Sequence, residues 1–437
     1  MGARETALNV LIACRKEGGW SNSVLKEYCY RDRLDSRDSG LAARLCYGVI
    51  QNRGLLDFYL QQLLTGKTKQ LHPVVHDILH LGLYQLYLMD KIPESAAVNE
   101  SVELSKKYCK KQYNAAGLVN AVLRNAIRSK DTLKQPISWE DKYSHPGELI
   151  NLLKSYVGKE RIEPMLMANN AIAPITAQVN TLKTTADDLQ KRLEEEGVTA
   201  QKHSWLSDCL VLSGTGNIEQ LPAFREGLFY IQDPAAKLSV LCADIQLGQK
   251  VLDCCAAPGG KSFGAAMAMQ GQGSITSCDI HSHKIDLIAK GAQRLGISNI
   301  TAKGQDATVF CSQWENAFDT VIADVPCSGL GIIRKKPDIR YKDLSALAEL
   351  PVLQEKILHN AARYVKPGGL LLYATCTLVQ AENEGMVEQF LSTHPQFTTE
   401  PLPLPGNFPK NESGMLALVP GEYDTDGFFF CRLRRNV

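Results

Sequence analysis

Three short segments in the second half of the chain constrain its fold most, because each places special residues directly after an apolar stretch. Val251-Leu252-Asp253 leads through two cysteines into Ala257-Pro258-Gly259-Gly260-Lys261, the pattern of a strand, a glycine turn and a helix. Asp324-Val325-Pro326-Cys327 and Tyr373-Ala374-Thr375-Cys376 each put a cysteine just past an apolar strand. Glycines let a backbone approach a ligand closely, and a helix N-terminus offers free N–H groups. The three segments predict a nucleotide-type cofactor pocket flanked by two thiols.

A regular alternation of strands and helices begins near residue 238. Strands are expected to end at Asp253, Asp279, Asp306 and Asp324, with helical stretches between several of them. This rhythm predicts a Rossmann-like α/β domain with a doubly wound parallel sheet, which binds ligands at the carboxyl ends of its strands. Asp279 is placed to bond ribose hydroxyls and Asp324 to lie where cofactor meets substrate. Asp306 contacts the adenine edge or merely caps its strand.

The rest of the chain divides into three further segments, so the fold class is multi-domain. Residues 1–135 have apolar side chains at helical spacing and predict an all-α bundle. Residues 136–173 are interpreted as a helical linker. Residues 174–237 predict a small α/β unit, with strands near 177–180, 210–212 and 228–231 and a helix begun by Thr185, and this unit is either an RNA-binding platform or a spacer. Residues 238–437 form the cofactor-binding domain.

Composition limits the class of protein. With 44% hydrophobic and 22% charged residues, and no apolar run long enough to span a bilayer or to form a signal peptide, we expect a globular cytoplasmic protein without membrane attachment. Thirteen cysteines without a Cys-x-x-Cys pair fit free thiols rather than disulfides or structural zinc. Residues 1–130 carry 19 Lys and Arg against 12 Asp and Glu, an excess that suits a polyanionic partner.

The two strand-end thiols suit one particular reaction. Carbon 5 of cytosine is a poor nucleophile, but a thiolate that adds to carbon 6 turns the ring into an enamine whose carbon 5 can attack an electrophilic methyl group. A second thiol can then assist product release as base or acid. This chemistry alone does not decide which of Cys327 and Cys376 attacks.

Five stretches together resemble the bacterial 16S ribosomal RNA cytosine-5 methyltransferases of the RsmB (Sun/Fmu) type. They are residues 253–261, 324–331, 334–340, 375–384 (Thr375-Cys376-Thr377 to Glu382-Asn383-Glu384) and 426–430. The first 130 residues resemble the NusB-like RNA-binding domain in Leu81-Gly82-Leu83-Tyr84-Gln85-Leu86, in Ile92-Pro93 with residues 97–104, and in residues 118–124. The two resemblances cover nearly the whole chain.

The resemblance implies roles for individual residues. Cys376 would attack carbon 6 and Cys327 would help release the product. The cofactor would be S-adenosylmethionine, held by the loop and strand ends: Cys255, Ala256, Ala257, Pro258, Gly259, Gly260, Lys261, Asp279, Asp306 and Asp324. The chain departs from the family at Gln178, where Arg is usual, and at Ala235, where Ser is common.

RNA contact is expected from basic residues in two regions. They are Lys106, Lys107, Lys110, Lys111, Arg124 and Arg128 in the helical third and Arg334, Lys335 and Lys336 after Cys327, with Arg340 and Tyr341 beside them. The alternative to RNA contact is that the lysines of the first region lie at solvated helix ends and that the run after Cys327 is a solvated loop. His281 and His283 lack further ligands nearby, and His76 and His80 are interpreted as core or surface residues, so no metal site is expected.

The function expected is methylation of carbon 5 of a cytosine in 16S ribosomal RNA through a covalent cysteine–cytosine intermediate. The target base has to leave its stack, so we expect a loop or single-stranded cytosine, methylated by a monomer before or during small-subunit assembly. The same reaction on transfer RNA or another RNA and a non-catalytic RNA-binding assembly factor are the alternatives. A DNA methylase is disfavoured by the Thr-Cys motif, and a small-molecule methyltransferase by the basic helical third.

Overall fold

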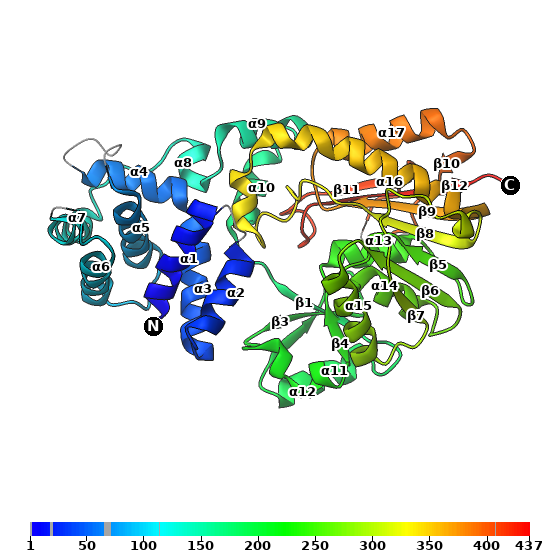
Figure 1. The fold of residues 1–437 in the computed structure, drawn as a ribbon, viewed down its shortest axis with the longest axis horizontal. Coiled ribbons are helices and arrows are strands. Elements are labelled where there is room, and N and C mark those ends of the chain that lie inside the picture. Colours follow the sequence, from blue (N-terminus) through cyan, green and yellow to red (C-terminus); the bar gives the residue numbers. More distant parts are fainter. Residues whose placement is uncertain (1, 18–20, 65–70, 113, 407) are drawn as a thin grey trace. The chain divides into compact units, whose positions relative to one another are not determined.

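The computed structural model describes residues 2–17, 21–64, 71–112, 114–406 and 408–437 (Figure 1). The chain forms two compact units. Unit 1 comprises Met1–Asn151 and the short segment Lys335–Lys342, and unit 2 comprises Leu152–Arg334 and Asp343–Val437. Within the described ranges, no helix has the length and apolar character needed to cross a membrane.

Unit 1 is a helical bundle, as the apolar spacing of its sequence predicts. Its core contains Leu8, Leu45, Leu79 and Leu123, all excluded from solvent, and burying each such side chain stabilises the bundle by about 2 kcal/mol. The helices are α1 (Ala3–Glu17), α2 (Ser21–Arg31), α3 (Ser36–Gln51), α4 (Arg53–Leu63), α5 (Pro73–Leu88), α6 (Glu94–Tyr108), α7 (Ala115–Ser129) and α8 (Trp139–Tyr143).

The segment Lys335–Lys342 completes unit 1 from a distant part of the sequence. It contains a 3-10 turn, η4 (Pro337–Tyr341), in which Arg340 is buried. One guanidinium nitrogen of Arg340 donates to the carbonyl oxygens of Gln51 at 2.7 Å and of Tyr143 and Ser144 at 3.3 Å each. The prediction that Arg340 contacts RNA phosphate is therefore wrong, because its guanidinium is enclosed by the protein and bound to backbone carbonyls.

The first part of unit 2 is a small antiparallel sheet with helices before and beside it. Strands follow the order β2-β3-β1-β4, and Thr185 caps α11 by accepting the N–H of Asp188, as predicted. Gly197, with a φ of 81°, follows that helix in the left-handed region that favours glycine. The elements are α9 (Gly147–Val157), α10 (Ile162–Asn170), β1 (Ile175–Val179), α11 (Ala186–Glu195), β2 (Thr199–Lys202), β3 (Cys209–Ser213), α12 (Pro222–Arg225) and β4 (Phe229–Ile231).

The second part of unit 2 is a larger mixed sheet, which confirms the Rossmann-like expectation. The strand order is β10-β12-β9-β8-β5-β6-β7, with β11 paired to β12; neighbours from β9 to β7 are parallel, and β12 is antiparallel to β9. The elements are α13 (Pro234–Cys242), β5 (Lys250–Asp253), α14 (Gly260–Ala268), β6 (Ser274–Asp279), α15 (Ser282–Leu295), β7 (Ile300–Gly304), β8 (Phe318–Asp324), α16 (Leu350–Tyr364), β9 (Val365–Thr375), α17 (Glu384–Thr393), β10 (Phe397–Thr399), β11 (Met415–Leu418) and β12 (Phe428–Arg435).

Helices cover both faces of this sheet, α14 and α15 on one side and α16 and α17 on the other (Figure 1). Successive side chains of β9 point to opposite faces of the sheet, so this one strand contributes to the cores on both faces. Leu370 and Leu372 belong to the core that contains residues of α14 and α15, whereas Leu371 and Tyr373 belong to the core with residues of α16 and α17. A doubly covered sheet of this kind leaves only strand ends and loops for a binding site.

Candidate active site

The register of the central strands brings the two sequence-predicted thiols together. Strands β8 and β9 are parallel neighbours in which Asp324 pairs with Ala374. Cys327 and Cys376 follow these two residues by three and two positions. Their Sγ atoms lie 3.3 Å apart, and the Sγ of Cys327 also accepts the backbone N–H of Cys376 at 3.3 Å. Both thiols are partly exposed, so a ligand can reach them.

The surroundings of Cys327 and of Cys255 raise the pKa of both thiols. The hydrogen bond with Cys376, followed by burial, raises the pKa of Cys327 well above its usual value, and the nearby carboxylate of Glu382 raises it further. Burial likewise raises the pKa of Cys255 in the glycine loop. Cys327 and Cys255 are therefore held as neutral thiols at neutral pH.

The glycine loop has no room for larger side chains. Gly259 has a φ of 110°, and a Cβ there would come within 2.4 Å of the Phe263 ring. At Gly260, the first residue of α14, a Cβ would come within 2.7 Å of the side-chain nitrogen of Gln232. Asp253 at the end of β5 accepts the hydroxyl of Ser262 at 2.8 Å, and burial raises the pKa of Asp253 to about 7. The start of α14 is thus anchored to the end of β5, and the loop between them has glycines where side chains would clash.

Two further acids were predicted from the sequence at strand ends, Asp279 and Asp306, and only the first ends its strand. Asp279 ends β6 as expected, and its Oδ1 accepts the N–H of His281 at 3.0 Å while Lys284 Nζ lies 3.6 Å from Oδ2. The prediction that a strand ends at Asp306 is wrong, because β7 ends at Gly304. Asp306 instead shapes the following turn by accepting both the N–H and the hydroxyl of Thr308.

Lys261 connects the glycine loop to the thiol region. Its Nζ lies 2.5 Å from Oδ2 of Asp324 and 5.0 Å from the centre of the Phe428 ring. Lys261 is buried, whereas Asp324 is 30% exposed, so the carboxylate is the more accessible partner. The sequence predicted both as cofactor residues, and the structure adds that they form one ion pair three residues before Cys327.

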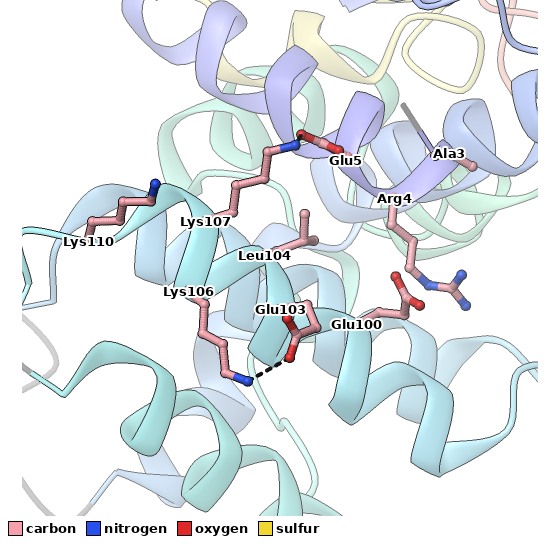
Figure 2. A pocket seen from close by; sticks show the side chains of 10 residues that line it. Ala3, Arg4, Glu5, Glu100, Glu103, Leu104, Lys106, Lys107 and Lys110 are labelled. Atoms are coloured by element: carbon pink, nitrogen blue, oxygen red, sulfur yellow. Dashed lines mark hydrogen bonds and ion pairs between the residues drawn. The ribbon is translucent and has the colours of Figure 1, made fainter.

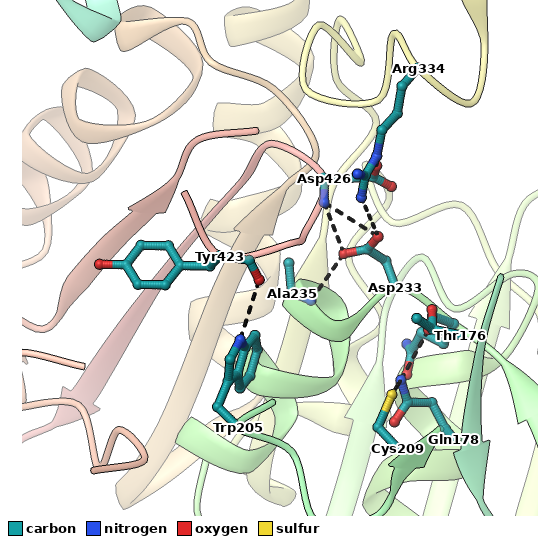
Figure 3. Close-up of polar contacts among 10 residues, drawn as sticks. Thr176, Gln178, Trp205, Cys209, Asp233, Ala235, Arg334, Tyr423 and Asp426 are labelled. Atoms are coloured by element: carbon teal, nitrogen blue, oxygen red, sulfur yellow. Dashed lines mark hydrogen bonds and ion pairs between the residues drawn. The ribbon is translucent and has the colours of Figure 1, made fainter. Parts of the chain in front are cut away.

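The basic run after Cys327 divides into one buried and two exposed residues. The side chain of Arg334 is only 6% exposed; its Nε donates to Asp426 at 2.6 Å and its Nη2 lies 3.7 Å from Asp233 (Figure 3). Asp233 also caps α13 by accepting the N–H of Ala235. Arg334 thus has an intramolecular role that the sequence did not suggest, and Lys335 and Lys336 are the exposed members of the run.

The two positions that depart from the family are internal. Gln178 is fully buried in β1, where its amide donates to Cys209 Sγ at 3.3 Å and to the carbonyl of Gln232 at 3.0 Å (Figure 3). Ala235 is also fully buried, at the start of α13. Both side chains therefore contribute to internal packing, and neither lies on an outer surface where it could contact RNA.

The basic residues of α6 line a surface pocket in unit 1 together with acidic ones. Lys106 pairs with Glu103 at 2.7 Å and Lys107 pairs with Glu5, while Lys110 also lines the pocket (Figure 2). Arg124 on α7 donates to Asn120 at 3.0 Å. Lys106, Lys107, Lys110, Lys111, Arg124 and Arg128 are all exposed, so each remains a candidate for phosphate contact.

Unit 1 also contains a histidine cluster that sequence reasoning missed. Nε2 of His76 and of His80 lie 2.7 and 2.9 Å from the same oxygen of Asp57. Three such groups could hold a metal ion, but these distances are those of hydrogen bonds. The helical spacing of His76 and His80 was visible in the sequence, whereas Asp57 comes from the preceding helix, α4. His281 and His283 stack on each other at the start of α15.

Comparison with known proteins identifies the family. Residues 240–434 match the family model of the 16S rRNA methyltransferase RsmB/F, residues 1–128 that of the NusB family, and residues 145–219 that of the RsmF/B-like ferredoxin-like domain. A probable ribosomal RNA small subunit methyltransferase B of Bacillus subtilis is 35% identical over 99% of this chain and 98% of its own length. The chain belongs to the RsmB/F family of 16S rRNA methyltransferases. A ribosomal RNA small subunit methyltransferase B of Vibrio cholerae is 35% identical over 93% of this chain and 92% of its own length.

Solved structures agree with this membership. The crystal structure of PH0851 matches 100% of this chain and 99% of its own with a TM-score of 0.80 and 25% identity. A methyltransferase homologue from Pyrococcus horikoshii matches 68% of this chain and 97% of its own with a TM-score of 0.56 and 26% identity. Membership in RsmB/F confirms the expected NusB-like bundle, the methyltransferase class and its S-adenosylmethionine cofactor.

Proposed function

We propose that this RsmB/F methyltransferase modifies carbon 5 of a cytosine in 16S ribosomal RNA through a covalent bond to Cys376. The observation that carries the proposal is the thiol pair, two Sγ atoms 3.3 Å apart at the ends of adjacent strands of a methyltransferase sheet. Methylation of a nitrogen or a hydroxyl requires no covalent nucleophile from the protein. A carbon atom that is a poor nucleophile, such as carbon 5 of cytosine, must be activated before it can accept a methyl group, and a thiol at this position can supply that activation by covalent addition.

The residues would act in a fixed order. The Cys376 sulfur, as thiolate, bonds to carbon 6, and the electron pair of the 5,6 double bond makes carbon 5 nucleophilic. After methylation, the proton on carbon 5 passes to water, its bonding pair restores the double bond, and the bond between Cys376 and carbon 6 breaks with its electron pair returning to the sulfur. Cys327, beside the attacking sulfur and held neutral by its raised pKa, is assigned to this release, because its thiol can donate a proton to the departing sulfur of Cys376.

The loop and strand ends fit the cofactor in chemical type. The cradle at Gly259 and Gly260, which a Cβ would fill, and the first N–H groups of α14 suit a carboxylate, and Asp279 suits ribose hydroxyls. When bound there, S-adenosylmethionine supplies an electrophilic methyl group. Lys261 and Asp324 link this cradle to the thiols and keep a donor and an acceptor next to the reacting base.

The position of the methyl group tests the proposal directly. Unmodified 16S RNA carrying tritium on carbon 5 of its cytosines would be incubated with the full chain and S-adenosylmethionine. We expect one tritium released to water for each methyl group transferred, because the carbon 5 proton has to leave. Methyl transfer without tritium release would contradict the proposal, and faster transfer to transfer RNA would move the substrate to that alternative.

Replacing Asp279 with alanine is expected to weaken S-adenosylmethionine binding by about 1–3 kcal/mol, because a carboxylate acceptor for hydroxyl groups is lost. Calorimetric titration of the cofactor into the full chain measures the change. Asp286→Asn, at an exposed acid on α15, is the matched control and should leave affinity unchanged. Equal affinity of the Asp279 variant and the wild type would remove Asp279 from the cofactor site.

A further inference from the structure

Two consecutive buried residues, Glu382 and Asn383, each bind the turn of a different catalytic cysteine. Glu382 ends the 3-10 turn η6 (Gln380–Glu382), Asn383 directly precedes α17, and both are fully excluded from solvent. The sequence marked them only as part of the family resemblance and gave them no task. We propose that Glu382 and Asn383 are positioning residues, Glu382 for the release step of Cys327 and Asn383 for the attack by Cys376. This inference rests on the proposed function of the two thiols.

The carboxylate of Glu382 holds the Cys327 turn on both sides. Its Oε2 accepts the backbone N–H of Ser328 at 2.9 Å and the side-chain amide of Gln354 at 2.8 Å. The same amide nitrogen of Gln354 donates to the carbonyl of Pro326 at 3.0 Å. The residues immediately before and after Cys327 are therefore fixed by one carboxylate, directly or through Gln354.

Glu382 is itself anchored to the central sheet. Its backbone carbonyl accepts the hydroxyl of Tyr373 on β9 at 2.6 Å. Burying a carboxylate is expensive unless its bonds compensate for lost water, and both protein donors of this one come from the Cys327 turn and its support. An apolar residue would fill the space without needing these donors, so the two bonds point to a task in holding the Cys327 turn.

Asn383 holds the Cys376 turn in the same two-sided manner. Its Oδ1 accepts the hydroxyl of Thr375 at 2.6 Å, and its Nδ2 donates to the carbonyl of Thr377 at 3.0 Å. Nδ2 also lies 3.2 Å from the hydroxyl of Tyr156, which extends the support to α9. The residues before and after Cys376 are thus fixed by one amide.

Because Glu382 and Asn383 adjoin in the chain, they also fix the two cysteine turns relative to each other. The hydroxyls of Ser328 and Thr377 add a direct contact between the turns at 2.5 Å. Misplacement of a reacting group by about 1 Å costs roughly 100-fold in rate. Loss of Glu382 should therefore impair the release step of Cys327, whereas loss of Asn383 should impair the attack by Cys376.

The test compares Glu382→Ala and Asn383→Ala in the full chain with unmodified 16S RNA and S-adenosylmethionine. Two quantities are measured: the rate of the first methyl transfer and the fraction of protein linked to RNA after denaturation. For Glu382→Ala we expect a first turnover within about threefold of wild type and an adduct raised roughly tenfold, because release fails. For Asn383→Ala we expect a first turnover slowed roughly 100-fold and no added adduct.

Controls separate positioning from folding and from the proposed function. Glu382→Gln keeps an oxygen for the Ser328 N–H and should recover most of the release rate. Glu388→Ala, at an exposed acid on the same α17, is the matched control and should accumulate no adduct. Cofactor affinity and thermal unfolding report on folding. Cys327→Ala runs in parallel: no adduct there would refute the proposed function. Adduct with Cys327→Ala but not with Glu382→Ala, or equal slowing of the first turnover by both alanine variants, would overturn this inference.

Discussion

Replacing Cys376 with alanine will lower the rate of methyl transfer about 10⁴-fold or more, because the reaction loses its only route to an activated carbon 5. The change removes one sulfur from a partly exposed position after β9 and leaves the cofactor cradle, which follows β5 two strands away in sheet order, untouched. Initial rates of methyl incorporation into unmodified 16S RNA measure the effect.

Affinity for S-adenosylmethionine provides the internal control for that variant and should stay at the wild-type value. Cys29→Ala, which removes another partly exposed thiol on α2, is the matched substitution and should retain full activity. A Cys376 variant that transfers methyl groups at more than a few per cent of the wild-type rate would show that this sulfur is not the nucleophile.

Replacing Gly331 with alanine is expected to reduce methyl transfer roughly 100-fold and to destabilise the protein by about 3 kcal/mol, because it forces two backbones apart. A Cβ at this position would come within 2.1 Å of the carbonyl oxygen of Gly427. The present contact includes bonds from Gly331 N–H to Cys376 O at 3.0 Å and from Gly427 N–H to Gly331 O at 2.8 Å. The loop after Cys327 would thus lose its link to Cys376.

Thermal unfolding and methyl-transfer rates should be measured together for this variant. Gly40→Ala is the matched control, since the same methyl group there meets open space on α3 and should stabilise the helix by up to about 1 kcal/mol. Wild-type activity of the Gly331 variant would mean that this backbone contact does not hold the thiol loop.

Local signals explain why much of the fold was predictable. Periodic apolar residues predicted the helical bundle of residues 1–135, and acidic strand ends located β5, β6 and β8. Strand β2 carries no such signal, because three of its four residues are exposed. The end of β7 was misplaced because Asp306, which resembles the strand-end acids, serves the next turn.

Only those residues of the candidate site that stand in short, contiguous sequence motifs could be predicted from the sequence. The two thiols and Asp279 stand in recognisable patterns, and the strand register shows why the thiols meet. The ion pairs of Arg334 could not be predicted, since Asp233 and Asp426 lie about a hundred residues away in opposite directions along the chain. The roles inferred for Glu382 and Asn383 depend likewise on tertiary contacts.

A covalent-trapping experiment tests the central claim most directly. Cys327→Ala and Cys376→Ala would be incubated separately with unmodified 16S RNA and S-adenosylmethionine, denatured, and examined for protein that migrates with RNA. We expect a stable adduct with Cys327→Ala and none with Cys376→Ala, because the Cys327 variant can attack the base but cannot release it. An adduct only with Cys376→Ala would reverse the roles of the two thiols, and no adduct with either variant would contradict the covalent mechanism.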